Sequence, residues 1–203
     1  MAGPTREFWE QRFAEGHTPW DRGEANPQLG AWLGSGALKP CRIVVPGCGS
    51  GYEVAVLAKA GFDVTGLDYA PVAIERTRKL LEAANLKAEL VEADALAWRP
   101  QRPFDAIYEQ TCLCALYPDD WRAYADQLHR WLAPAGKLYA LFVQLLRAGA
   151  AEGTIQGPPY HCDINAMRAL FPEPLWSWPK PPYPRTTHPL GLAELAVILV
   201  RRG

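Results

Sequence analysis

The chain has 203 residues, of which 49% are hydrophobic and 21% charged, and its formal net charge is -1. This length fits one domain with a sizeable core, so we treat residues 1–203 as a single domain. The near-neutral charge gives no electrostatic reason to expect binding to nucleic acid or to an anionic membrane surface, and it favours a small-molecule partner.

The sequence also bears on the cellular location of the protein and on whether its cysteines form disulfides or bind a metal. The sequence has no apolar run of about 20 residues that would span a bilayer, and its first residues lack the apolar core of a secretory signal. The five cysteines are irregularly spaced, and none forms a Cys-x-x-Cys pair. We therefore expect free thiols, no metal site and a cytoplasmic location. No heptad or repeat is visible, so we expect a monomer.

Two helices are predicted in the first 40 residues. One spans residues 5–15, where aromatic side chains recur at helical spacing after Thr5, a plausible N-cap. Pro27 can occupy the first turn of a second short helix that ends near Leu33. We expect residues 1–40 to form a helical lid segment.

From residue 42 onward, short apolar runs alternate with helical patterns. The predicted strands are 42–46, 62–67, 88–91, 104–108, 137–143 and 194–200, and the predicted helices are 52–60, 71–84, 119–132 and 163–170. Such alternation is typical of a parallel sheet covered by helices. We expect a Rossmann-like, doubly wound α/β fold in three α/β/α layers, with a mostly parallel, seven-stranded sheet whose last strand is antiparallel. The carboxyl ends of its parallel strands would share one edge, where ligands bind.

A glycine-rich turn, VPGCGSGYE at residues 45–53, joins the first of these strands to a helix. Gly47, Gly49 and Gly51 permit positive φ and a close approach of the backbone to a ligand, and the helix N-terminus favours an anionic group. A tight turn without ligand is the alternative. The dinucleotide fingerprint needs glycine where this chain has Tyr52, so the turn favours S-adenosylmethionine (SAM) over a nicotinamide dinucleotide.

Polar residues follow the next three strands. Asp68 is placed to accept hydrogen bonds from both ribose hydroxyls of an adenosine, with a helix N-cap as the alternative. Asp94 is placed to accept from the adenine amino group beside the Ala95 backbone, with a solvated loop aspartate as the alternative. Glu109 and Gln110 would face the amino-acid end of the cofactor or orient a substrate, unless they belong to a simple loop.

With these residues in view, the chain resembles the thiopurine S-methyltransferase-like superfamily of class I SAM-dependent methyltransferases. That superfamily includes thiol and halide methyltransferases and enzymes acting on tellurium and selenium species. The similar segments are FWEQRF at 8–13, TPWD at 18–21, the glycine turn at 45–51, GLDY at 66–69, YEQT at 108–111 and GPPY at 157–160. The N-terminal tryptophan-rich segment and the Gly-Pro-Pro-aromatic loop are more specific than the glycine turn.

The resemblance implies that the N-terminal segment folds over the cofactor, which here means Trp9, Phe13 and Trp20. An aromatic wall around a sulfonium is physically reasonable, because a cation is attracted to ring faces. Core packing of an amphipathic helix is the alternative for the first two. Together with the loop at 149–160, this segment would act as a lid that excludes water.

The resemblance also assigns cofactor contacts along the strand ends. It places Asp68, with Tyr69 beside it, on the ribose, Asp94 and Ala95 on the adenine, and Gly47 along the methionine part. One departure concerns the substrate: the drug-methylating members carry an arginine where this chain has Gln110. The YEQT string is closer to the thiol, halide and bacterial members.

The expected reaction is in-line transfer of the SAM methyl group to a thiol, halide or related sulfur or selenium nucleophile, with S-adenosylhomocysteine as product. Such nucleophiles need positioning and desolvation more than a dedicated base, and no convincing acid–base pair is visible. The substrate-pocket candidates are Trp20, Glu109, Gln110 and Tyr160. Candidates for a base by position only are His17, His129, His161 and Asp163, for which a surface role is the simpler interpretation.

Three other functions stay open at this point. A nicotinamide dehydrogenase is disfavoured by Tyr52 and by the aromatic N-terminus. An O- or N-methyltransferase of a small metabolite would need a base that is not evident. A SAM-binding sensor would bind the cofactor without turnover.

Overall fold

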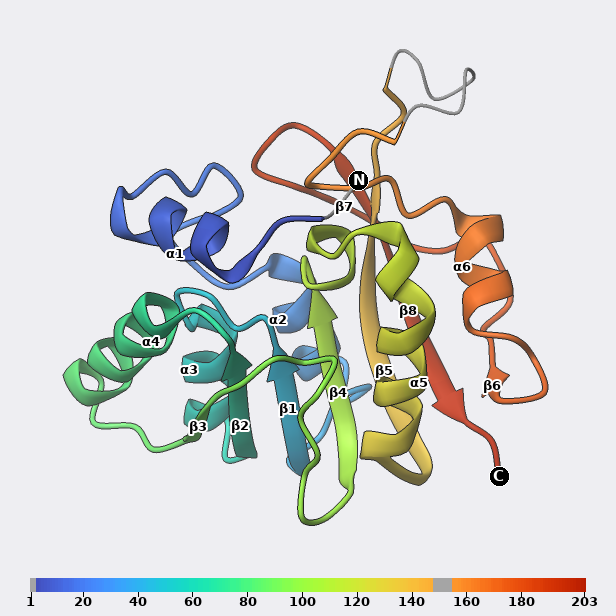
Figure 1. Ribbon diagram of the computed structural model, residues 1–203. Helices are drawn as coiled ribbons and strands as arrows, with labels where there is room; N and C mark the ends of the chain where they lie inside the picture. Colours follow the sequence, from blue (N-terminus) through green and yellow to red (C-terminus); the bar gives the residue numbers. More distant parts are fainter. Residues whose placement is uncertain (1–2, 148–154) are drawn as a thin grey trace.

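The fold is described from a computed structural model that places residues 3–147 and 155–203. Its strands form one sheet in the order β3-β2-β1-β4-β5-β8-β6, with β7 pairing to β8 beside this path (Figure 1). The strands are β1 (Arg42–Pro46), β2 (Asp63–Asp68), β3 (Glu89–Glu92), β4 (Phe104–Gln110), β5 (Leu132–Gln144), β6 (Trp176–Ser177), β7 (Arg185–Thr187) and β8 (Ala193–Arg201). The first five strands in the chain pair in parallel, whereas β8 is antiparallel to β5, β6 and β7.

Helices cover both faces of this sheet. They are α1 (Arg6–Ala14), α2 (Pro27–Gly34), α3 (Tyr52–Lys59), α4 (Pro71–Ala83), α5 (Trp121–Trp131) and α6 (Ile164–Leu170), with short 3-10 turns η1 (Leu113–Ala115) and η2 (Pro118–Asp120). Side chains of α2, α3 and α4 pack in one core cluster, and those of α5 and α6 pack in another. The predicted three-layer, Rossmann-like class is confirmed.

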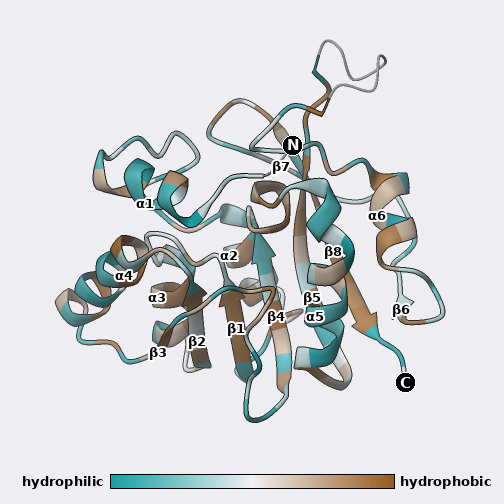
Figure 2. Cartoon of the chain, viewed as in Figure 1, coloured by the Kyte–Doolittle hydropathy of each residue, from teal (hydrophilic) through white to brown (hydrophobic). Residues whose placement is uncertain are grey.

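The two cores follow from the alternation of side chains along the central strands. In β1, Ile43 and Val45 belong to the α2–α3–α4 cluster, whereas Val44 belongs to the α5–α6 cluster. A strand buried on both faces needs apolar residues at every position, and β1 is brown along most of its length in Figure 2. The carboxyl ends of β1, β2 and β4 point to the same edge, beneath α1 and the β7 region in Figure 1.

Two predicted N-caps, Thr5 and Asp163, are confirmed by their capping bonds. The Thr5 hydroxyl accepts from the Phe8 N–H at 3.4 Å, and the Asp163 carboxylate accepts from the Asn165 N–H at 2.9 Å. Asn26, which precedes Pro27, caps α2 in the same way. Polar side chains at these positions satisfy N–H groups that have no partner within the helix.

The predicted strand count of seven is wrong, because the described sheet has eight strands. The short strands β6 and β7 lie in the proline-rich region and carry almost no periodic signal. The predicted boundary of β5 also differs: the strand begins at Leu132, the residue at which the preceding helix was expected to end, and Leu132 pairs with Phe104 before a register shift. Ala135 there adopts a φ of 61°, which marks the irregularity.

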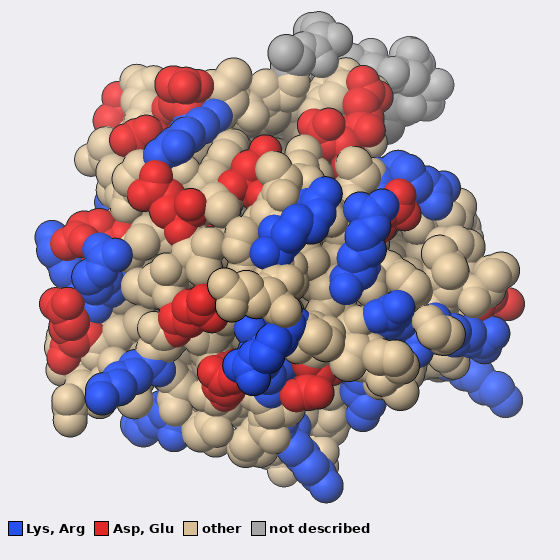
Figure 3. Space-filling model, turned by 60° about the horizontal axis from the view of Figure 1, so that its bottom comes forward, with Lys and Arg blue, Asp and Glu red and all other residues tan. Residues whose placement is uncertain are grey.

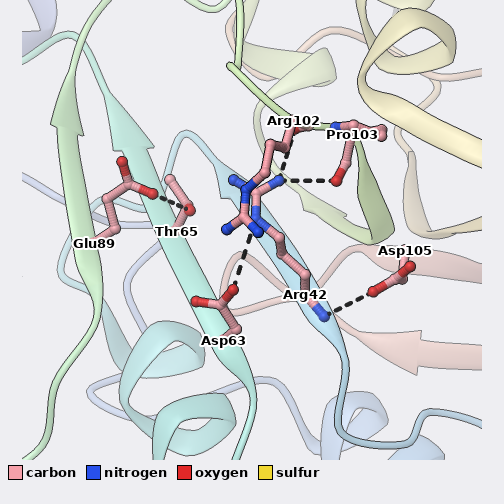
Figure 4. Close-up of polar contacts among 7 residues, drawn as sticks. All are labelled: Arg42, Asp63, Thr65, Glu89, Arg102, Pro103 and Asp105. Carbon is pink, nitrogen blue, oxygen red and sulfur yellow. Dashed lines mark hydrogen bonds and ion pairs between the residues drawn. The ribbon is translucent and has the colours of Figure 1, made fainter.

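The opposite edge of the sheet is fixed by Arg42 (Figure 4). Its guanidinium donates to the carbonyl oxygens of Arg102 and Pro103 at 2.7 and 2.9 Å and lies 3.7 Å from the Asp63 carboxylate. Its backbone N–H donates to Asp105 at 3.0 Å. These contacts connect the amino ends of β1 and β2 with the loop before β4.

On the face shown in Figure 3, basic and acidic side chains are interspersed. This agrees with the formal net charge of -1. No helix among the described residues is long and apolar enough to cross a membrane.

Candidate active site

A cavity of about 250 Å³ lies at the carboxyl edge of the sheet, close to the lower end of the roughly 300–1,000 Å³ range of small-molecule sites. Its walls come from the loop after α1, the glycine turn, the ends of β2 and β4, and the loops after β3 and β7. Ten of the predicted site residues border it: Trp9, Phe13, Trp20, Gly47, Gly49, Asp68, Tyr69, Asp94, Ala95 and Gln110. The structure thus brings together residues that are up to 101 positions apart in the sequence.

The glycine turn forms the floor of the cavity. Gly47 has a φ of +61°, and a Cβ atom there would lie 3.0 Å from the Cβ of Cys112, so the backbone itself faces the cavity. Gly51 has a φ of +80° and is the N-cap residue of α3. It does not border the cavity; it faces the Thr77 side chain, which would lie 2.5 Å from an added Cβ.

Asp68 stands at the end of β2, next to this turn. It is 7% exposed, and its two oxygens accept from the N–H groups of Gly49 and Ala70, both at 3.0 Å. Burial raises the pKa of this carboxyl, and the backbone N–H donors oppose that rise. A carboxylate has about four acceptor positions, so acceptor capacity remains for hydroxyl donors in the cavity beside the backbone N–H donors. The contact with Ala70 forms a turn before α4, but the N-cap residue of α4 is Ala70 and no side chain caps this helix, so Asp68 does not have the alternative capping role.

The side of the cavity nearest β3 is formed by Tyr69, Asp94 and Ala95. Asp94 is exposed and lies two residues beyond β3, and its carboxylate accepts from the Leu96 N–H at 2.8 Å. Burial raises the pKa of Tyr69 far above its ordinary value, so its hydroxyl is a neutral donor near neutral pH.

Three aromatic rings from the N-terminal segment cover this edge. Trp20 meets Trp9 and Phe13 edge to face, with ring centroids 5.4 and 6.0 Å apart. Phe13 is buried against Ala70 and Ala73, so it has the core-packing role that was the alternative and also borders the cavity. The cover is attached to α4 through the Arg76 guanidinium, which donates to the Phe13 carbonyl.

Gln110 and Glu109 are adjacent in β4 but face different surroundings. Gln110 borders the cavity and accepts from the Tyr108 hydroxyl at 2.9 Å. Glu109 is 1% exposed and does not border the cavity; its carboxyl accepts from the Leu113 N–H at 2.7 Å. Burial raises the pKa of Glu109 to about 7. Strand alternation separates the two side chains, which the prediction had treated as a pair.

The predicted Gly-Pro-Pro-aromatic loop is divided between two surfaces. Pro158 and Pro159 border the main cavity, whereas Tyr160 borders a second hollow together with His161. Residues 148–154, which include most of the predicted lid loop, lie outside the described residues. The remaining candidates for a base, His17, His129 and Asp163, do not border the main cavity.

Several polar residues at the cavity were not predicted from the sequence. Arg22, Glu53 and His188 border it, and Glu194, which is fully buried, accepts from the Asn26 amide at 2.9 Å beside them. The available signals were weak. Arg22 directly follows the TPWD segment, and Glu194 is the one charged residue near the start of an apolar strand.

The sequence is similar to a family profile and to individual proteins that are all named as methyltransferases. The sequence profile of the family described as thiopurine S-methyltransferase matches residues 4–177. A probable thiol methyltransferase 2 from Arabidopsis thaliana is 34% identical over 166 residues, covering 80% of this chain and 70% of the relative. Thiocyanate methyltransferase 1 from the same plant is 32% identical with the same coverage.

A solved structure supports the fold independently. The 1,6-didemethyltoxoflavin-N1-methyltransferase of Burkholderia thailandensis, solved with S-adenosylhomocysteine, superposes with a TM-score of 0.78. The match covers 100% of this chain and 92% of the other at 17% identity. At that identity the likeness concerns the architecture.

Proposed function

The chain belongs to the thiopurine S-methyltransferase family and is a SAM-dependent methyltransferase, and we propose that its acceptor is a small sulfur nucleophile such as a thiol or thiocyanate. Halides and selenium species of similar reactivity belong to the same proposal. The names of its relatives support it, since they include thiol and thiocyanate methyltransferases. An O- or N-methyl acceptor stays the second candidate.

One observation carries the placement of the cofactor. Asp68 keeps free acceptor positions at the cavity wall, while the Gly49 N–H of the glycine turn and the Ala70 N–H fix its orientation. This donor and acceptor set fits an adenosine: Asp68 would hold the ribose, Asp94 and Ala95 would border the adenine, and the Gly47 backbone would follow the methionine part.

When bound, SAM supplies an electrophilic methyl group on a sulfonium sulfur. The residues of this chain orient that group and exclude water from it. The rings of Trp9, Phe13 and Trp20 present aromatic surface, which attracts a cation. Pro158 and Pro159 also border the cavity. An anionic nucleophile has no proton to lose, so these residues can act without a general base.

Glu109 takes a positioning role in this scheme. Its carboxyl holds the Leu113 N–H and so fixes η1, which follows β4 directly. The neighbouring Cys112 and Cys114 border the cavity. Glu109 would therefore shape the acceptor side without touching the substrate.

The test is calorimetric titration of S-adenosylhomocysteine into the parent chain, Asp68→Ala and Asp63→Ala. Asp63 begins the same strand at the opposite edge and serves as control. Loss of two charge-assisted hydrogen bonds, each worth about 1.5 kcal/mol or more, should weaken binding by Asp68→Ala at least ~100-fold. Asp63→Ala should bind as the parent does. Unchanged affinity of Asp68→Ala for S-adenosylhomocysteine would contradict the proposed position of the cofactor.

The acceptor class is tested by S-adenosylhomocysteine production from SAM with thiocyanate, iodide and simple thiols. We expect turnover with at least one of them. Tight cofactor binding with no product from any acceptor would instead support a sensor. Product formed only with hydroxyl or amine acceptors would support the second candidate.

We further propose that residues 1–40 act as a cover that closes over bound cofactor. Trypsin cleavage at Arg12 and Arg22, which border the cavity, should slow when S-adenosylhomocysteine is present, while cleavage at exposed Lys59 and Lys87 should not. Equal cleavage at all four sites with and without the ligand would argue against a cover.

Further proposals concern the location, oligomeric state and partners of the protein. We propose a cytoplasmic, single-domain monomer that acts on small molecules and not on nucleic acid. The five cysteines, all free thiols, support a reducing compartment. Size-exclusion chromatography with light scattering tests the monomer directly.

A further inference from the structure

One end of the cavity carries polar side chains that the proposed function leaves unused. Arg22 lies in the loop after α1, Glu53 in the first turn of α3, and His188 in the turn between β7 and β8. Since β8 pairs with β5, His188 lies at the β5–β8 side of the edge, whereas Asp94 follows β3 at the other side. This end is therefore remote from the part assigned to adenine.

Hydrogen-bond donors at this end have no protein partner. Nε and Nη2 of Arg22 are buried and, within residues 3–147 and 155–203, neither finds an acceptor. The same holds for Nε2 of His188, a residue only 3% exposed. A buried donor without a partner costs about 1–3 kcal/mol, so these groups indicate a ligand that supplies acceptors.

The hydrogen bonding of His188 fixes which nitrogen carries the proton. Nδ1 accepts from the Leu190 N–H at 3.2 Å, so the proton of the neutral ring is on Nε2. Burial and the nearby charge of Arg22 lower the pKa of His188 to about 4. At neutral pH the ring is therefore an uncharged donor at Nε2.

Arg22 is held in place through its neighbour and is not neutralised by an ion pair. The Asp21 carboxylate accepts from the Gly23 N–H at 2.7 Å and from the Ser50 hydroxyl at 2.6 Å, which fastens the loop to the glycine turn. In the part of the chain that the structure describes, Arg22 is not a member of any ion pair. Its charge remains available to a ligand.

The two nearby carboxyl groups are engaged by Asn26. Its N–H donates to Glu53 and its side-chain amide to Glu194, both at 2.9 Å. Burial raises the pKa of both, to about 7 for Glu194. Oε1 of Glu194 also has no partner among the described residues. When protonated, that carboxyl becomes a further donor and does not repel an anion.

We propose that Arg22 and His188 form an anion subsite that binds the methyl acceptor as a small, soft monoanion such as thiocyanate, iodide or a thiolate. The inference rests on the proposed function and deepens it. The Nε and Nη2 edge of a guanidinium presents two parallel N–H groups, and the His188 N–H adds a third. An acceptor held in this way is already deprotonated, so the site needs no base.

The test is titration of thiocyanate, and separately iodide, into the full chain saturated with S-adenosylhomocysteine, which binds without turnover. We expect Arg22→Met to weaken anion binding at least tenfold and His188→Gln to weaken it several-fold. Arg22→Lys keeps the charge without the paired N–H groups and should give an intermediate loss. Arg99→Met is the matched charge control, because Arg99 donates only to nearby backbone carbonyls away from the cavity, and it should bind as the parent does.

Two results would overturn the subsite. Unchanged anion affinity in folded Arg22→Met and Arg22→Lys would show that the guanidinium N–H groups of Arg22 do not bind the anion. A loss of S-adenosylhomocysteine affinity in the same variants would assign Arg22 to the carboxylate of the cofactor instead. Failure of the parent to bind S-adenosylhomocysteine at all would count against the proposed function, so the two failures are distinguishable.

Discussion

Glu109 places a carboxyl group in the interior, where water cannot solvate its charge. Burial raises its pKa from the ordinary 4.5 to about 7, the Leu113 and Cys112 N–H groups oppose this, and Glu194 adds to it. Because the folded-state pKa lies above the unfolded one, the fold binds this proton more tightly than the unfolded chain does. The resulting stability is complete below pH 4.5 and is lost as the pH rises through 7.

Glu109→Gln should therefore change how stability depends on pH. At pH 8.5 the ionised parent loses on the order of a few kcal/mol through this group, and the variant avoids that loss while its amide oxygen still accepts from Leu113. Urea unfolding at pH 5.0, 7.0 and 8.5 should show a flatter profile for the variant. Some slope will remain from Glu194, whose pKa is also raised to about 7. Parallel profiles for parent and variant would contradict this account.

At the same scale, residues whose role follows from local sequence were predictable. Asp68 and Gly47 stand at the end of a strand and at the start of a glycine turn, and both border the cavity as expected. Arg22 and His188 meet there although 166 positions separate them. Neither has a local pattern that indicates a site, because their proximity depends on how β8 inserts beside β5.

At the scale of elements, the start of α3 depends on Gly51. Its φ of +80° is strained for any residue with a Cβ, and that atom would lie 2.5 Å from the Thr77 side chain. Gly61, just after the same helix, has a φ of +86° and open space around it. The two positions therefore separate backbone strain from steric contact.

Gly61→Ala should lower the free energy of unfolding by about 1 kcal/mol, the ordinary penalty for a left-handed non-glycine residue. Gly51→Ala should cost clearly more, about 3 kcal/mol, since the contact with Thr77 adds to the strain. Chemical unfolding of both variants measures the difference. Equal losses of unfolding free energy in the two variants would show that the Thr77 side chain can move away from the added Cβ atom at no measurable free-energy cost.

Helices and strands with a clear hydrophobic pattern in their own sequence were predicted correctly. Short strands that form only because they pair with a distant strand were not. α4 and β1 have clear patterns and were predicted nearly to their ends. The strands β6 and β7 have two and three residues and owe their existence to pairing with β8. The early start of β5 likewise depends on the partner strand β4.

Across the whole molecule, the two edges of the sheet have different roles: the carboxyl edge forms the binding cavity, and the opposite edge holds contacts that stabilise the fold. The cavity occupies the carboxyl edge, and Arg42 connects the elements at the opposite edge while its guanidinium lies 3.9 Å from the centre of the Phe104 ring. A change at Arg42 should therefore affect the fold without reaching the ligand.

Arg42→Met should lower the free energy of unfolding by about 2 kcal/mol, because it removes two hydrogen bonds of the guanidinium, to the Arg102 and Pro103 carbonyls, and its ion pair with Asp63. S-adenosylhomocysteine affinity of the folded variant should stay within about twofold of the parent, less than 0.5 kcal/mol. Arg78→Met, which breaks an exposed pair with Glu75, is the control and should change stability by about 0.5 kcal/mol or less. A marked loss of affinity in Arg42→Met would show that the edges are coupled.

The interior position of β8 has a consequence for synthesis on the ribosome. β5 and β6 are both translated before β8, the strand that lies between them in the sheet. Until β8 emerges, the nascent chain presents the long apolar border of β5 with its backbone groups unpaired, a surface that readily recruits strands from other chains. Slow or interrupted translation of β8 would thus expose the newly made protein to aggregation along this border of β5.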